Sequence, residues 1–133
     1  MFKTLKEWLA NISEKPDVDD ALEKMKTQVG VILYHVIIAD EQQTDEECEL
    51  FCKLFKSRFN EEETAIRQRF DQLRRLEGTL GVQVDVIKKH LSDDGKDYME
   101  LMKIVNDMIN VDGIDDREYQ VFSEIKKKLS KIN

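Results

Sequence analysis

The sequence predicts an all-α protein, a single bundle of about seven helices with two pseudo-repeated halves. Three observations predict this class. The 133 residues include only five Gly and one Pro, too few for the many turns of a β-sandwich or barrel. Apolar residues make up 41% of the chain, and they recur at the spacing of one helix face. Three segments carry the residue pair of a capping box, in which Thr, Asn or Asp precedes Glu by three positions and opens a helix.

The charge balance argues against several classes of function. The 21 basic and 28 acidic residues give a net charge of −7. Binding to nucleic acid or to anionic lipid requires basic surface, so we expect neither. The longest apolar run, residues 29–39, is about half as long as a membrane-spanning helix, which predicts no membrane insertion. The first residues do not fit a signal peptide, and we therefore expect a cytoplasmic protein.

The first half of the chain contains the patterns of four helices. Apolar residues at helical spacing predict a first helix from Phe2 to about Ser13, and Pro16 with Asp17 opens a second that reaches about Asp40. Capping boxes open the next two helices. These helices run from Thr44 and Glu47 to about Phe59, and from Asn60 and Glu63 to about Glu77.

The second half contains three more helices. A short fifth helix holds Val84, Ile87 and Leu91, before the turn at residues 93–95. A sixth helix runs from about Lys96 to Val111. A third capping box, Asp115 with Glu118, opens a seventh that reaches about Leu129.

We divide the chain into an N-terminal amphipathic helix with a linker, residues 1–16, and a helical domain, residues 17–133. Trp8 in this first helix needs a surface to pack on, together with Leu5 and Leu9. We expect the helix to fold back onto the bundle. The alternative is that it packs on another chain, so Trp8 is also a candidate partner-binding residue, and either a monomer or a homodimer is compatible with the sequence.

A weak internal repeat relates residues 29–59 to residues 101–129. In each copy an apolar helix ends in an apolar or small residue followed by Asp, as Ala39-Asp40 and Val111-Asp112. A short polar turn and a capped amphipathic helix follow in both copies. Two copies are too few for a solenoid, so we expect two helical pairs packed about a pseudo-twofold axis.

This pattern, present twice, resembles the TerB-like family, which includes tellurite-resistance TerB proteins and the membrane-proximal domain of the DjlA co-chaperones. The resemblance covers about residues 20–130. It implies a compact seven-helix bundle with two similar halves. The sequence contains no His-Pro-Asp tripeptide, which excludes J-domain activity from this chain.

The resemblance also implies a divalent-metal site at the acidic motif positions, which correspond here to Asp40, Glu47, Asp112 and Glu118. A cation such as Ca²⁺ would suit these oxygen ligands, although we expect no cofactor to be required. The chain departs from the family pattern at Glu41, where Gly is usual, and in a second turn one residue shorter. The residues themselves favour a structural role, in which each Asp accepts hydrogen bonds from the following turn. Both roles are compatible, because a hydrogen-bonded carboxylate has a second oxygen.

The segment from Ala39 to Glu49 contains six acidic residues and no basic residue. We expect Glu46 and Glu49 to lie on a solvated helix face. Together with the acidic residues of the second motif, residues 112–118, they would form an acidic surface. Such a surface suits a hard cation or a basic segment of a protein partner, and we take Glu46 and Glu49 as candidate partner-binding residues.

Motifs for catalysis are missing from the sequence. It has no Gly-x-Ser-x-Gly and no phosphate-binding loop. A Zn²⁺ site built from His35 and His90 with Cys48 and Cys52 is conceivable, but two Cys four apart on one helix are unlike the usual structural knuckle. We interpret both cysteines as reduced, small apolar residues of a helix face.

These observations lead to a ranked set of functions. The first is a non-enzymatic TerB-like interaction module, in a stress response such as tellurite resistance, that binds a partner through its acidic surface. The alternative is a sensor or scaffold protein that binds a divalent metal through the paired acidic motifs. An enzyme that uses paired carboxylates ranks last, because no substrate pocket can be inferred.

Overall fold

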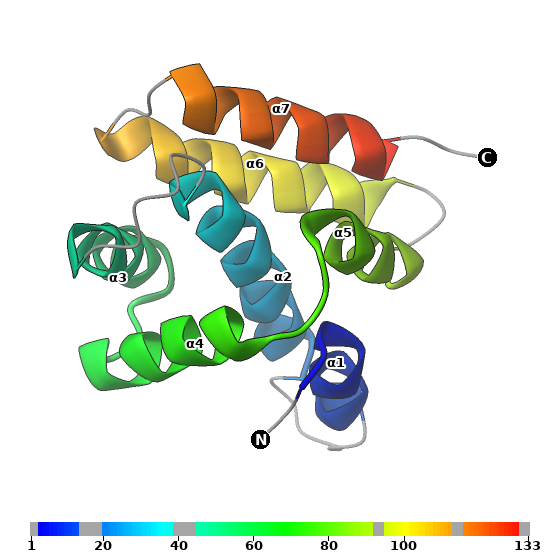
Figure 1. Ribbon diagram of the computed structural model, residues 1–133, viewed down its shortest axis with the longest axis horizontal. Helices are drawn as coiled ribbons and strands as arrows, with labels where there is room; N and C mark the ends of the chain where they lie inside the picture. The colour runs from blue at the N-terminus through cyan, green and yellow to red at the C-terminus, as the bar shows by residue number, and fades with distance from the viewer. Residues whose placement is uncertain (1–2, 14–19, 39–44, 92–94, 113–115, 131–133) are drawn as a thin grey trace.

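The computed structural model describes residues 3–13, 20–38, 45–91, 95–112 and 116–130, and the chain forms seven α-helices within these ranges (Figure 1). The all-α prediction is confirmed. The helices are α1 (Leu5–Ser13), α2 (Asp20–Ile37), α3 (Asp45–Phe59), α4 (Glu63–Arg75), α5 (Leu80–Lys89), α6 (Lys96–Asp112) and α7 (Asp116–Ser130).

Helix α2 lies at the centre of the bundle, where it packs against all six other helices. In Figure 1, α6 and α7 lie side by side along one edge of the molecule, and α2 passes between them and the other helices. The apolar run of the sequence explains this position, because the second half of α2, residues 29–37, is apolar on all sides and must be covered on all sides. Its buried apolar residues are Val29, Val31, Ile32, Leu33, Tyr34, Val36 and Ile37.

A buried arginine connects α2 and α4. Arg69 on α4 is 9% exposed, and its guanidinium forms ion pairs with Glu23 of α2, at 2.9 Å, and with Glu61, at 3.3 Å. Lys26 of α2 lies 3.0 Å from the same Glu61 carboxylate. Burial opposes the ionisation of Glu61, but the cations of Arg69 and Lys26 outweigh it and hold the pKa of Glu61 below its ordinary value. The carboxylate is therefore charged and paired at neutral pH.

The first helix folds back onto the bundle, as we expected, and α1 packs against α2 and α5. Trp8 is 8% exposed and belongs to the core, with the Arg69 guanidinium 6.0 Å from the centre of its ring. The backbone preceding α1 is also anchored, because the N–H of Glu77 donates to the carbonyl of Lys3 at 2.6 Å. This contact joins the N-terminal segment to the α4–α5 connection.

The capping box predicted at Asn60 and Glu63 is wrong. Asn60 has a left-handed backbone, with φ of 54°, and its N–H donates to the carbonyl of Lys56 at 2.8 Å. It therefore ends α3, because a left-handed residue commonly follows the last turn of a helix. The N-cap of α4 is Glu62, whose side chain makes no capping hydrogen bond.

The other two predicted caps, Thr44 and Asp115, lie outside the described residues. The helices that follow begin at Asp45 and Asp116, one residue after each predicted cap. Helix α5 begins earlier than its apolar pattern suggests. Thr79 is its N-cap, and the Thr79 side chain accepts a hydrogen bond from the N–H of Val82.

The two halves of the internal repeat correspond to α2–α3 and α6–α7. Helix α2 packs against both α6 and α7, and α3 packs against α6. Helix α2 ends at Ile37, three residues before the predicted end at Asp40, whereas α6 continues through Asp112. Asp40 and the side chain of Asp112 lie outside the described residues, so the expected proximity of these two carboxylates stays a prediction.

Candidate functional site

The candidate acidic surface lies on the first turns of α3. Glu46 and Glu49 are exposed, while Glu47 between them is 8% exposed. The helical register explains this difference, because Glu47 precedes the core residue Phe51 by four positions and so shares its face. The structure thus brings Glu46 and Glu49 to the surface together and turns Glu47 toward the interior.

The four residues that the resemblance assigns to a metal are only partly described. Glu47 is buried on α3, and Glu118 is half-buried on the first turn of α7. The carboxylate oxygens of this set match the ligands of a hard cation such as Ca²⁺. Among the side chains that the structure describes, no three His, Cys, Asp or Glu residues converge as a metal site. The set would need Asp40 and Asp112 to be complete.

The two cysteines lie on the inner side of α3 as free thiols, one buried and one half-buried. Burial, with the neighbouring Cys48, raises the pKa of the Cys52 thiol to about 11. Cys52 is therefore protonated and a poor nucleophile at neutral pH. The sulfur of Cys48 accepts a hydrogen bond from Arg67 at 3.6 Å.

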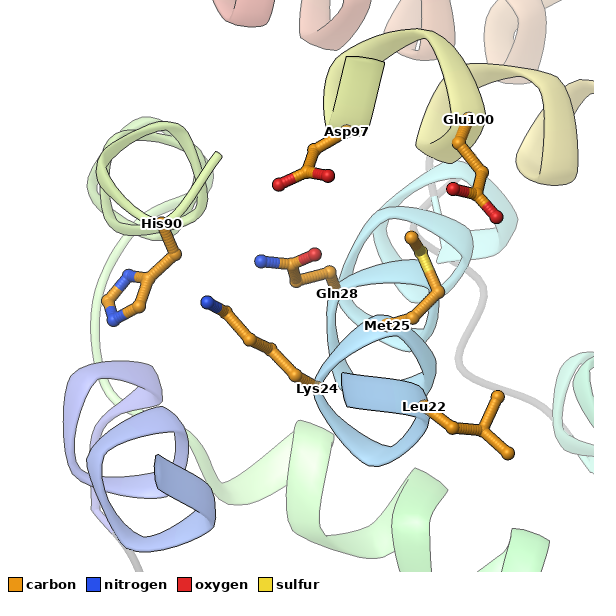
Figure 2. Close-up of a pocket in the computed structure, with 7 residues that line it drawn as sticks. All are labelled: Leu22, Lys24, Met25, Gln28, His90, Asp97 and Glu100. Atoms are coloured by element: carbon orange, nitrogen blue, oxygen red, sulfur yellow. The ribbon is translucent and has the colours of Figure 1, made fainter. Parts of the chain in front are cut away.

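A half-open groove of about 350 Å³ lies where α2, the end of α5 and the start of α6 meet (Figure 2). Seven residues line it: Leu22, Lys24, Met25, Gln28, His90, Asp97 and Glu100. Its volume is at the lower end of the range of small-molecule pockets, about 300–1,000 Å³. The lining combines apolar side chains with ammonium, amide and carboxylate groups, so it contains both hydrogen-bond donors and acceptors.

The most unusual group in this groove is the side-chain amide of Gln28. The residue is 3% exposed, and its Nε2 is buried without a hydrogen-bond partner among the described residues. Figure 2 shows Nε2 pointing into the groove, toward the same space as the Lys24 ammonium. Buried amide groups in proteins nearly always have partners, so this donor is an exception among the described residues.

None of these groove residues was predicted from the sequence. They come from three segments, of which residues 22–28 lie about 60 positions before the other two, His90 and residues 97–100, and each segment alone has an ordinary amphipathic pattern. One signal was available. Gln28 lies within the apolar stripe of α2, four positions before Ile32, where a polar residue is uncommon.

Comparison with known families identifies the fold. The family model described as tellurite resistance protein TerB matches residues 26–130. The chain belongs to the TerB family. TerB domains form a non-catalytic family. They are all-helical, which agrees with the seven helices of the described residues. No curated protein and no solved structure matches this TerB chain.

Within the described residues, every helix is too short or too polar to cross a bilayer.

Proposed function

We propose that this chain is a non-enzymatic interaction module that acts in a stress response of the kind its family description names, tellurite resistance. Its acidic surface, the exposed side chains of Glu46 and Glu49 on α3, binds a basic segment of a protein partner. The observation that carries this proposal is the exposure of these two glutamates in a stretch, residues 39–49, that contains no basic residue.

Charge complementarity explains how such a surface would select its partner. Exposed carboxylates attract a basic segment over a distance of about 10 Å at 0.1 M salt, which accelerates encounter and disfavours acidic proteins. The net charge of −7 adds to this field. Because the contact is solvent-exposed, its strength falls as the salt concentration rises.

Charge reversal tests this proposal. We expect Glu46→Lys with Glu49→Lys to remove partners that the wild-type chain binds at low salt, without loss of helicity, because both residues are exposed. The control is Asp107→Lys with Glu124→Lys, which changes the net charge equally on α6 and α7, where both residues are also exposed. Partners cross-linked in cells that express each version are identified and then measured with purified proteins at 50 and 300 mM salt. A partner that both double variants bind equally well, or whose affinity is insensitive to salt, contradicts the proposal.

A second candidate function is the binding of a divalent cation by Asp40, Glu47, Asp112 and Glu118. The burial of Glu47, beside two exposed glutamates, favours it. Its burial places one of the four carboxylates in the interior, where a ligand to a cation would be shielded from water. A bound cation would fix the relative positions of the two motifs and thereby the shape of the acidic surface.

Thermal melts with chelator and with millimolar Ca²⁺ test the second candidate. Binding stabilises the wild-type chain by about 2.7 kcal/mol at a hundredfold excess of cation over Kd. Asp40→Asn and Glu47→Gln should abolish this stabilisation, whereas Glu49→Gln, on the exposed face of the same helix, should keep it. Equal shifts in all four proteins, or no shift in any, would leave these carboxylates with a structural role alone.

A further inference from the structure

We propose that Cys48 and Cys52, the two free thiols of α3, form a two-thiolate site for a soft metal ion, Cu(I). The site uses sulfur ligands, and it rests neither on the function proposed for the acidic surface nor on the divalent-cation candidate. Three features carry the inference: the position of the two thiols on one helix face, a small opening beside Cys52, and the guanidinium of Arg67.

The helical spacing sets the distance between the two thiols. Cys48 and Cys52 are four positions apart on α3, so their side chains share one face, with Cβ atoms about 5–6 Å apart. The thiols are close enough to form a hydrogen bond with each other. A direct disulfide requires Cβ atoms about 3.5–4.5 Å apart, which needs a distortion of the helix. An ion between the two sulfurs, with metal–sulfur bonds of about 2.3 Å, spans the longer gap.

The opening beside Cys52 has room for an ion. A half-open cavity of about 120 Å³ lies where α3 packs against the start of α4. It is lined by Glu49, Cys52, Lys53, Lys56 and Glu63. This volume is well below that of small-molecule pockets, about 300–1,000 Å³, but it exceeds the space that one water molecule needs, about 10–15 Å³. A small ion can therefore reach the buried thiol from solvent.

The ligands favour a soft ion that needs few of them. Thiolates bind soft ions such as Cu(I), whereas Mg²⁺ and Ca²⁺ prefer oxygen. A structural zinc site needs four ligands, and among the described side chains no three His, Cys, Asp or Glu residues converge. Cu(I) forms linear complexes with two thiolates, so the pair is sufficient for it. Binding replaces the proton of each thiol, which passes to solvent, and neither copper nor sulfur changes its oxidation state.

Arg67 of α4 compensates the charge of such a complex. Two thiolates and one Cu(I) leave one negative charge in excess. The Arg67 guanidinium donates to the Cys48 sulfur at 3.6 Å and also pairs with the exposed Glu63 at 3.7 Å. A donor that contacts the sulfur from outside the coordination sphere stabilises a thiolate ligand. Arg67 is therefore a positioning residue of the site and not a ligand.

Competition for Cu(I) tests the site on the full, reduced chain without oxygen. The probe is Cu(I) itself, supplied as its complex with the chromophoric chelator ferrozine, whose absorbance reports transfer to the protein. We expect one Cu(I) per chain and a thiolate-to-Cu(I) charge-transfer band in the ultraviolet. Excess Zn²⁺ should not displace the Cu(I), because zinc finds only two of its four ligands here. No transfer from ferrozine, or Zn²⁺ binding as tight as that of Cu(I), overturns the proposal.

A variant of unchanged composition assigns the binding to the pair. Cys48→Ser with Ser123→Cys keeps two thiols but moves one of them to an exposed position of α7. We expect it to bind Cu(I) about a hundredfold more weakly, because the two sulfurs no longer hold one ion together. Ser123→Cys alone is the matched control and should bind like the wild type. Wild-type affinity in the double variant overturns the assignment, and if that variant does not fold, Cys52→Ala with Ser123→Cys decides.

Two further variants separate the site from its neighbours. Arg67→Gln should weaken Cu(I) binding about tenfold, as expected for a contact outside the coordination sphere, and should keep one ion per chain. Unchanged affinity would overturn the role of Arg67. Glu47→Gln, which removes a carboxylate of the divalent-cation candidate, should bind Cu(I) like the wild type. Loss of Cu(I) in this variant would overturn a site built from two thiolates alone.

Discussion

At the scale of single residues, His35 shows how a tertiary contact defines the state of a titratable group. Its Nε2 lies 2.7 Å from Oε1 of Gln83. The Gln83 Nε2 donates to the carbonyls of Glu77 and Gly78, at 3.4 and 3.5 Å, which leaves Oε1 as an acceptor. The neutral His35 ring must therefore carry its proton on Nε2 and donate it to Gln83.

This arrangement makes folding sensitive to pH. Burial lowers the pKa of His35 below 6.5, against the opposing effect of the Gln83 hydrogen bond. Between the lowered pKa and 6.5 the unfolded chain binds a proton that the folded chain does not, so stability falls as the pH drops through this window. We expect His35→Gln to lose less stability than the wild type between pH 7 and pH 5, measured by urea unfolding. Equal slopes in the wild type and His35→Gln would refute the argument.

The face of the helix on which a candidate side chain lies could be predicted from the sequence where the register of a single helix decides it. The spacing of Glu47 and Phe51 places both on one face of α3, and Glu46 and Glu49 fall on the other. The groove beside Gln28 forms only together with the end of α5 and the start of α6, which no local pattern contains. The hydrogen bond between His35 and Gln83, which are 48 positions apart, likewise cannot be predicted from the pattern of either helix alone.

At the scale of helices, the order and number of the helices could be predicted from apolar spacing and turn residues, whereas some helix boundaries could not. Asn60 and Glu63 have the residue types and spacing of a capping box, yet the backbone of Asn60 lies in the left-handed region. Asn suits both an N-cap and the residue after a helix, so the sequence alone could not distinguish them. The contact of Glu77 with Lys3 likewise joins segments whose proximity depends on the whole fold.

Two substitutions at Asn60 distinguish these roles. At an N-cap, Ser is as good as Asn, whereas in the left-handed region a residue such as Ser costs about 1 kcal/mol. We therefore expect Asn60→Ser to destabilise the protein by about 1 kcal/mol in chemical denaturation and Asn60→Gly to cause no loss, since Gly adopts positive φ without strain. A wild-type midpoint for Asn60→Ser would show that Asn60 caps α4.

At the scale of the whole molecule, the central position of α2 connects all the other helices. The chain was divided from its sequence into a first segment, 1–16, and a domain, 17–133. In the structure, α1 buries Leu5, Trp8 and Leu9 in the same core as α2, and the division itself stays a prediction. Because each helix packs against α2, a defect in α2 should weaken the whole bundle rather than one half of the repeat.

Unfolding followed by two spectroscopic signals tests whether the bundle unfolds as one cooperative unit. Trp8 is the only tryptophan, so its fluorescence reports on α1, whereas far-UV circular dichroism reports on all helices. We expect the two transitions in urea to coincide for the wild type. Ile32 is 0% exposed in α2, and Ile32→Ala should shift both transitions together by about 2–5 kcal/mol, because the cavity removes contacts to several helices. Met99→Ala, at a position 70% exposed on α6, should leave both unchanged. If the Trp8 signal of Ile32→Ala were lost at a lower urea concentration than its helicity, α1 would be an appended element, and residues 1–16 would form a unit of their own.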